Sequence, residues 1–264
     1  MIKKIFLLIC ISFSFTIFAE NKIIGISGEI IISPLSKINS DSEQVLYAEY
    51  NGIRYAIIGM PYSNKEKIIS IGNSKITILP KDYGESRINI TDSSKVLLNK
   101  ENAARATKEA LLIKKNIALY SHKSLSDLDF NLPVDGIISS RFGKKRYIND
   151  IPRSPHMALD IAAPKGTSIF SPSDGKVVLV GDFFYGGKYV LLDHGMGLLT
   201  SYSHMSEILV EEGMIIIKGQ EIGLVGSTGR VTGPHLHWTV YLNKERVNPE
   251  LFLNKNIITT ISDL

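Results

Sequence analysis

Cysteine is almost missing from this chain of 264 residues, which contains one, Cys10. Cys10 lies within an apolar run, Ile5–Phe18, that follows two lysines and precedes Ala19 and polar residues. This order is typical of a secretory signal peptide cleaved after Ala19. The run is shorter than the roughly 20 residues that span a bilayer, so we expect residues 1–19 to be removed and not to form an anchor. A mature chain without cysteine excludes disulfides and thiolate metal sites, so metal ligands would have to be histidine or carboxylate.

A strong net charge is missing as well. The chain has 30 basic and 26 acidic residues, a formal net charge of +4, and loses two lysines with the predicted signal peptide. Such a weak basic balance carries no signature of nucleic-acid binding. After residue 19 no stretch is long and apolar enough to cross a membrane. We therefore expect a mature chain of one large or two modest globular domains, with no nucleic-acid partner and no membrane span.

The first part of the mature chain, residues 20–99, consists of short β-branched runs separated by glycine and proline, and it contains no histidine. Runs of this kind predict a small β-sandwich-like domain, to which we assign a binding or spacer role. Residues 100–131 begin with a segment rich in alanine, lysine and leucine, which predicts a connecting helix, and end in an extended linker. His122, in this linker, is expected to face solvent without a role.

Residues 132–264 return to a β pattern, with closely spaced turns and almost no helical segment. Strands at such short spacing predict a compact antiparallel sheet folded over a groove. Segments 146–155 and 181–188 are candidates for the groove walls. The fold expected for the whole chain is thus mainly β, with a connecting helix between two domains.

The sequence GPHLHW places two histidines, His235 and His237, one residue apart. Side chains alternate between the faces of a strand, so both imidazoles point the same way. In HMALD, His156 and Asp160 are four residues apart and share a face if this segment is also a strand. Catalytic zinc sites use three histidine or carboxylate ligands and keep one position open. His156, Asp160 and one imidazole of the pair can fill such a site, which leaves the other imidazole free to exchange protons.

Two further histidines lie in the same part of the chain. His204, in SYSHM, could supply another imidazole from a strand that faces the site across the groove. His194, in LLDHGMG, ends a predicted strand at a glycine turn and has no partner at ligand spacing. We interpret His194 as a histidine that is hydrogen-bonded in the core or rests on the surface.

The motifs HMALD, YSHM and GPHLHW follow one another in this order, with DIAAPKGTSIFSPSDGKVV and KGQEIGLVGSTG between them. In this they resemble the LytM/lysostaphin-type zinc metallopeptidases, peptidase family M23, over roughly residues 132–252. One departure is visible at Ala158, where members of that family usually have glycine. The resemblance implies one Zn²⁺ ion per chain held by three residues, His156, Asp160 and His237. It also implies two catalytic histidines, His204 and His235.

The resemblance also implies an activity and a location. Members of the family hydrolyse peptide bonds in the crosslinks of bacterial peptidoglycan, so we expect peptidoglycan peptides as the substrate. The mature chain would act in the periplasm or after secretion, where a regulatory envelope protein is a further candidate partner. The proton-transfer roles are assigned to His204 and His235 together.

Two other functions fit parts of this pattern. An inactive domain of the same type could bind peptidoglycan or activate another cell-wall hydrolase, but such a domain is expected to lack metal ligands, and here all five site positions are filled. A zinc carrier would explain the ligands and not the additional imidazoles. The first domain could cover the groove until it is displaced, or it could position the enzyme on the wall.

Overall fold

The structure is a computed structural model that describes residues 23–38, 45–72, 74–89, 98–253, 257 and 261. The predicted signal peptide, residues 1–19, lies outside the described residues. Across the described part of the chain, no helix is both long enough and apolar enough to span a membrane. Most of the elements are strands, as the sequence predicted.

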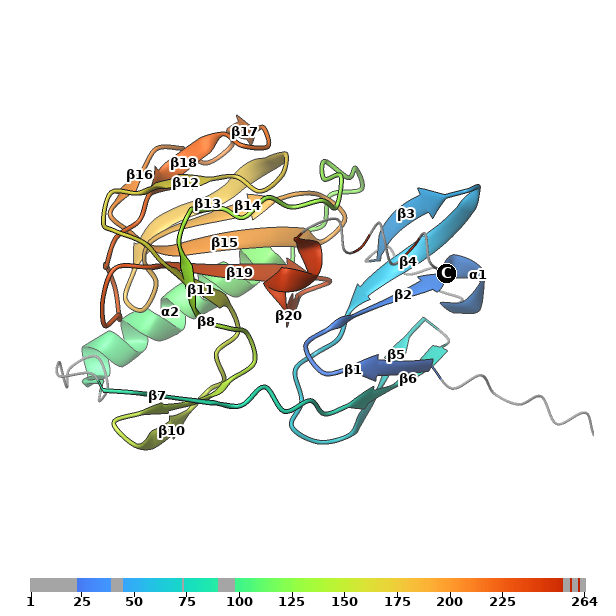
Figure 1. Cartoon of the computed structure of the whole chain (residues 1–264), viewed down its shortest axis with the longest axis horizontal. Helices are drawn as coiled ribbons and strands as arrows, with labels where there is room; N and C mark the ends of the chain where they lie inside the picture. The colour runs from blue at the N-terminus through green and yellow to red at the C-terminus, as the bar shows by residue number, and fades with distance from the viewer. Residues whose placement is uncertain are drawn as a thin grey trace, which may run out of the picture.

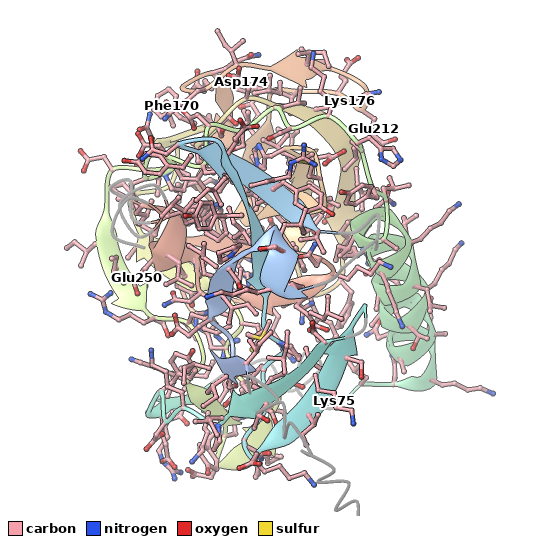
Figure 2. The ribbon with its side chains drawn as sticks, turned by 90° about the vertical axis from the view of Figure 1, so that its right-hand side faces the viewer. Lys75, Phe170, Asp174, Lys176, Glu212 and Glu250 are labelled. Atoms are coloured by element: carbon pink, nitrogen blue, oxygen red, sulfur yellow. The ribbon has the colours of Figure 1, made fainter. Side chains whose placement is uncertain are left out.

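Two small sheets form the first part of the molecule. One has the order β1-β6-β5 and the other β2-β4-β3. Their strands are β1 (Ile23–Ile26), β2 (Ile30–Pro34), β3 (Leu46–Tyr50), β4 (Ile53–Gly59), β5 (Lys67–Ile71) and β6 (Ser74–Leu79). A short helix, α1 (Leu35–Ile38), follows β2. Ala56 and Ile58 of β4 share a buried core with Ile76 and Ile78 of β6, so the two sheets pack face to face as a small sandwich. Figure 2 views the molecule from this side, with Lys75 of β6 on the lower sheet.

The largest sheet is antiparallel throughout and has the order β17-β13-β14-β15-β19-β11-β8, with β20 paired to β19. Its strands are β8 (Ile137–Ser140), β11 (Leu159–Ala162), β13 (Gly175–Phe183), β14 (Gly187–Asp193), β15 (Leu198–Met205), β17 (Ile215–Ile216), β19 (Leu236–Leu242) and β20 (Glu245–Val247). A smaller sheet of β12 (Ser168–Phe170), β18 (Glu221–Leu224) and β16 (Glu207–Ile208) lies beside it (Figure 1). A single 3₁₀ turn, η2 (Pro249–Phe252), follows β20.

The predicted connecting helix is α2 (Lys100–Ile117), capped by the Asn99 side chain, which accepts a hydrogen bond from the Asn102 N–H. In Figure 1 it runs behind the large sheet. Ile113 and Ile117 on one face of the helix pack against Leu179, Tyr189 and other buried residues of the sheet. The helix therefore packs against the sheet and is not an isolated linker between two domains.

One sheet joins the two parts of the chain, which the sequence did not predict. Strand β7 (Glu85–Ile88) pairs in parallel with β9 (Lys145–Ile148), and β10 (Ile151–Arg153) pairs with the other edge of β9. Figure 1 shows β7 reaching from the small sheets beneath the large one. The cores are also continuous, because Tyr55 and Ile57 of β4 belong to the same buried cluster as Val240 and Val247.

Candidate metal centre

Two of the predicted ligands are direct neighbours across a strand pair. Asp160 on β11 is the register partner of His237 on β19. The Asp160 Oδ1 atom lies 2.7 Å from His237 Nδ1. Long-range pairing of two strands that are remote in sequence thus places one carboxylate and one imidazole side by side. The sequence predicted that the two motifs could converge, but not this strand pairing.

His156 reaches the same point by a different route from the one predicted. It precedes β11, which begins at Leu159, so the strand alternation assumed for His156 and Asp160 is wrong. Two backbone bonds hold His156 in place, from its N–H to the Lys144 carbonyl (2.8 Å) and from the Gly143 N–H to its own carbonyl (2.6 Å). The fully buried His156 Nε2 lies 2.9 Å from Asp160 Oδ1 and 3.4 Å from His237 Nδ1.

These three donors fit a divalent cation. The His156 Nδ1 atom lies 3.0 Å from the Arg141 carbonyl oxygen, which can only accept, so Nδ1 carries the proton. In the neutral ring Nε2 then presents a lone pair to the carboxylate oxygen 2.9 Å away, an arrangement that a cation or a proton between them would stabilise. A carbonyl that accepts from the other ring nitrogen and fixes the tautomer in this way is the usual partner of a metal-binding histidine. Histidine and aspartate are also donors that zinc accepts.

His204 and His235 lie beside this triad. His204 is on β15, the strand next to β19 in the same sheet, because Ser203 is the register partner of His237. The prediction that His204 faces the site from across the groove is therefore wrong, although its ring centre lies only 5.6 Å from that of His237. His235 immediately precedes β19, and its ring centre lies 4.9 Å from that of His204. All five predicted residues are thus brought together.

Each of these two imidazoles is oriented by a backbone carbonyl. His204 Nδ1 donates to the Thr228 carbonyl (2.9 Å), and His235 Nδ1 donates to the Gly233 carbonyl (2.9 Å). Both rings therefore keep an unprotonated Nε2 when they are neutral, and His235 Nε2 lies 3.8 Å from Asp160 Oδ1. His204 also has a positive φ of 67°, an uncommon conformation for a side chain of this size. Backbone strain of this kind is frequent at functional sites.

A second triad of histidines, His204, His235 and His237, also brings nitrogen atoms within reach of one ion. The triad with the carboxylate is the better candidate, because its three donor atoms lie 2.7 to 3.4 Å apart. It also supplies a negative charge to balance a cation. The ligand roles remain a prediction.

The electrostatics of the site keep two of its imidazoles, those of His204 and His237, neutral. Burial lowers the pKa of His204 well below its usual value, and repulsion from His237 and His235 adds to this effect. Burial also lowers the pKa of His237 to about 4, against the opposing charge of Asp160. Burial alone would raise the pKa of Asp160, but the neighbouring His237 and His156 outweigh it and hold this pKa well below its usual range. His237 thus offers a neutral nitrogen atom and Asp160 an ionised carboxylate, the forms that bind metal.

The site opens into a hollow of about 310 Å³. Its walls include residues that the sequence analysis did not single out, among them Arg146, Arg230, Ser86 and Ile88. Arg146 belongs to the segment predicted as a groove wall, and Arg230 stands in a glycine turn five residues before His235, a position that could have drawn attention to it.

The other two histidines lie outside the site, as predicted. His122 is exposed. His194 is fully buried, and its ring contacts the Asp174 carbonyl at 2.6 Å and the Thr200 hydroxyl at 2.7 Å. It is therefore a hydrogen-bonded core residue, the first of the two alternatives that the sequence left open.

Comparisons with known proteins agree with this geometry. Residues 154–249 match the family model described as peptidase family M23. The chain is 40% identical over 147 residues to the peptidoglycan DD-endopeptidase ShyA of Vibrio cholerae, which covers 51% of this chain and 34% of that protein. It is 39% identical over 112 residues to the DD-carboxypeptidase/endopeptidase Mpg of Neisseria meningitidis, covering 42% and 26%.

A crystal structure from Pseudomonas aeruginosa, named as a candidate M23 peptidase, extends the similarity beyond the catalytic region. It superimposes with a TM-score of 0.67 at 30% identity and covers 86% of this chain and 94% of that chain. The alignments to ShyA and Mpg, by contrast, span about a third or less of those proteins. This chain therefore shares its fold with nearly the full length of the Pseudomonas aeruginosa protein.

Proposed function

The chain belongs to peptidase family M23, and from this premise we propose that it is a zinc-dependent endopeptidase that hydrolyses peptide bonds in peptidoglycan crosslinks. The observation that carries the proposal is the convergence of His156, Asp160 and His237 on one point, with two oriented imidazoles beside it. Relatives named as peptidoglycan DD-endopeptidases and a DD-carboxypeptidase/endopeptidase support the choice of substrate.

His156, Asp160 and His237 would hold the ion, one per chain. Zinc is the metal we propose, because the donor set is two imidazoles and one carboxylate and the chain offers no thiolate outside residue 10. When bound, it would supply a Lewis acid that activates water and polarises the scissile carbonyl. The Arg141 carbonyl orients His156 toward this task, since its bond to Nδ1 leaves only Nε2 for the ion.

His204 and His235 would move the protons. Each ring presents a lone pair on Nε2 while its Nδ1 is fixed by a carbonyl, so each can accept a proton from the attacking water. The resulting imidazolium would then stabilise the negative charge of the tetrahedral intermediate or protonate the leaving amine. The two rings lie 4.9 Å apart, centre to centre. Because the rings are this close, we propose the two roles for the pair and not for either residue alone.

We also propose the setting in which the enzyme works. The N-terminal apolar run and the cell-wall substrates named for the relatives point to the periplasm or the secreted fraction. The proposed division of the chain is a signal peptide over residues 1–19, a β domain over 20–99, a connector over 100–131 and the peptidase domain over 132–264. A regulatory envelope protein remains a proposed partner.

Digestion of purified sacculi tests this function. The mature protein with zinc should release muropeptides whose masses identify a hydrolysed peptide crosslink, and chelation should stop the release. A His235→Ala variant with unchanged zinc content should release none above background. Binding to sacculi without any release by the zinc-loaded protein would favour the inactive peptidoglycan-binding domain instead. If the protein contains one zinc ion per chain but neither binds sacculi nor releases muropeptides, the result would favour the zinc-carrier function.

A further inference from the structure

The sheet formed by β10, β9 and β7 presents two rows of side chains to the hollow. Arg146 is the register partner of Arg153 on one side and of Ser86 on the other, so these three side chains lie on one face of the sheet. Ile148 and Ile88 form the next row on the same face, and Ser86, Ile88, Arg146 and Ile148 all line the hollow. Tyr147 and Arg87 alternate to the opposite face, where the Arg87 guanidinium lies 4.2 Å from the centre of the Tyr147 ring.

The pairing of Arg146 with Arg153 places two like charges directly opposite each other. Like charges at directly opposite positions of an antiparallel strand pair destabilise the sheet. Here both arginines are also half-buried, so water screens their repulsion less than it would at the surface. A negative charge close to Arg146 would therefore reduce this repulsion.

Arg146 has unused hydrogen-bonding capacity. Its side chain is 21% exposed, and its Nη2 atom lies 3.8 Å from Asp160 Oδ2, beyond hydrogen-bond distance. Its Nε atom is buried and has no hydrogen-bond partner. A guanidinium has five N–H donors in a fork that matches the two oxygens of a carboxylate. Asp160 cannot supply this match if it is a metal ligand, because its Oδ1 atom is directed to His156 and His237.

Arg230 contributes a third positive charge to the same hollow. Its backbone N–H donates to the Tyr185 carbonyl (3.0 Å), and its guanidinium lies 4.2 Å from the centre of the Tyr185 ring. Burial lowers the pKa of Arg230, and the charges of Arg146 and Arg153 lower it further, so the three guanidinium groups act on one another. Among the described residues that line the hollow, Asp160 is the one carboxylate. With a divalent ion bound, the hollow would carry a clear excess of positive charge.

We propose that Arg146 and Arg230 form a subsite that binds a carboxylate group of the substrate peptide close to the scissile bond. This inference rests on the proposed function and names the substrate class more narrowly, as a peptide with a free carboxylate near the bond that is cut. The carboxylate is either the C-terminus of a stem peptide or an acidic side chain of that peptide. The two groups have the same chemistry, and the test below distinguishes them.

The competing explanation is that Arg146 only positions Asp160 for the metal. The two explanations differ in what a substitution does. A positioning role predicts that Arg146→Gln lowers zinc content and slows hydrolysis of every substrate equally. A subsite predicts that the loss is confined to substrates that carry the carboxylate, and that Arg230→Gln, which changes another residue lining the hollow, gives the same selective loss.

The test uses a synthetic crosslinked stem peptide in four versions, in which the C-terminal carboxylate, the side-chain carboxylates, both or neither are converted to carboxamides. The zinc-loaded mature protein should prefer one carboxylate version over its amide by about 10- to 100-fold in kcat/KM, the range expected for a charged hydrogen-bonded contact. The effect should fall mainly on KM. The version that loses activity identifies the source of the carboxylate.

Arg146→Gln and Arg230→Gln should each remove most of this preference while zinc content and hydrolysis of the amide version stay within about twofold of the parent protein. Arg87→Gln, on the opposite face of the same sheet, is the matched control and should keep the full preference. Equal kcat/KM for all four versions with the parent protein would overturn the proposal. An equal loss on every version, with less zinc, would assign Arg146 to positioning and overturn its part in the subsite.

A binding measurement separates this proposal from the proposed function. Calorimetric titration of the same four peptides into zinc-loaded His235→Ala protein needs no turnover. Selective binding of the carboxylate version without hydrolysis by the parent protein would keep the subsite and contradict the endopeptidase. Hydrolysis without selectivity would keep the endopeptidase and contradict the subsite. If Arg146→Gln does not fold, Arg230→Gln carries the same test alone.

Discussion

At the scale of single residues, the sequence predicted which histidines and which aspartate lie together better than it predicted the strands and loops that carry them. The spacing of His235 and His237 was sufficient because His235 immediately precedes β19 and His237 is the second residue of that strand. His156 could not be placed from spacing, since backbone bonds to Lys144 and Gly143 position it in a loop. Arg146 lies in a segment predicted as a groove wall and Arg230 in a glycine turn near His235. Neither position assigns a role, because an arginine reveals a function only when folding brings it next to other charges.

The first prediction concerns the two imidazoles outside the triad. His204→Ala and His235→Ala should each lower kcat about 100- to 10,000-fold, the usual contribution of a positioned acid or base. Zinc content should stay close to one per chain, because neither residue is a proposed ligand. His194→Gln is a control that changes a buried histidine remote from the site, and it should retain most of the activity. Loss of zinc in either alanine variant would instead favour the triad of His204, His235 and His237.

The second prediction concerns His194 and the dependence of stability on pH. Burial lowers the pKa of this ring in the folded chain, whereas in the unfolded chain it is near 6.5. The unfolded state therefore binds more protons below pH 6.5, so the free energy of unfolding should fall as the pH is lowered from 7 toward 5. The depressed pKa values of His204 and His237 act in the same direction, and Asp160 contributes only at lower pH.

Urea unfolding of the metal-free protein at pH 7.5 and pH 5.5 measures this effect. In His194→Gln the free energy of unfolding should be lower at both values, and the difference between the two pH values should be smaller than in the parent protein. An unchanged difference would mean that His194 does not contribute to the acid sensitivity.

At the scale of elements, strands and helix could be predicted, and the contacts between distant elements could not. The runs that became β4, β6 and β19 have clear β-branched patterns, and α2 has a clear helical composition. Strand β7 has no strong pattern of its own and gains its hydrogen bonds from β9, about sixty residues later in the chain. Parallel pairing of such remote segments depends on tertiary structure, which local propensity does not contain.

The third prediction concerns the segment that carries His156. Gly143 has a φ of 84°, donates to the His156 carbonyl and packs against the Tyr83 ring, which a Cβ atom would overlap. Gly143→Ala should therefore lower the free energy of unfolding by about 2 kcal/mol or more, since it combines backbone strain with overpacking. It should also weaken zinc binding, because His156 would shift with its backbone bond.

Gly84→Ala is the matched control for this variant. Gly84 has a similar φ of 77°, but a Cβ atom there would meet nothing within 4 Å. Its substitution should cost only the backbone strain, about 1 kcal/mol, and leave zinc affinity unchanged. Equal effects of the two substitutions, measured by urea unfolding and by zinc titration, would show that the Tyr83 contact does not position His156.

At the scale of the whole molecule, the two predicted domains share structure. Leu46, Tyr55 and Ile57 of the small sheets lie in one buried cluster with Trp238 and Val240 of the large sheet. A Cβ atom on Gly59 would come within 2.7 Å of the Leu242 carbonyl oxygen, so the backbones of β4 and β19 are in close contact. The sequence predicted a boundary near residue 100 from composition, but composition does not show how much core the parts have in common.

The fourth prediction follows from this shared core. The mature chain should unfold in a single cooperative transition, and zinc at about 100 times its Kd should raise its free energy of unfolding by about 2.7 kcal/mol. Differential scanning calorimetry with and without zinc measures both. Two transitions, of which zinc shifts only one, would show that the small sheets unfold independently of the site.

The central claim is that His156, Asp160 and His237 hold one zinc ion, and anomalous diffraction at the zinc absorption edge tests it most directly. Crystals of the mature protein grown with zinc should give one anomalous peak in the hollow, about 2.0 to 2.2 Å from His156 Nε2, Asp160 Oδ1 and His237 Nδ1. A peak bound by His204 and His235 in place of His156 and Asp160, or no peak in the hollow at full zinc loading, would contradict the account.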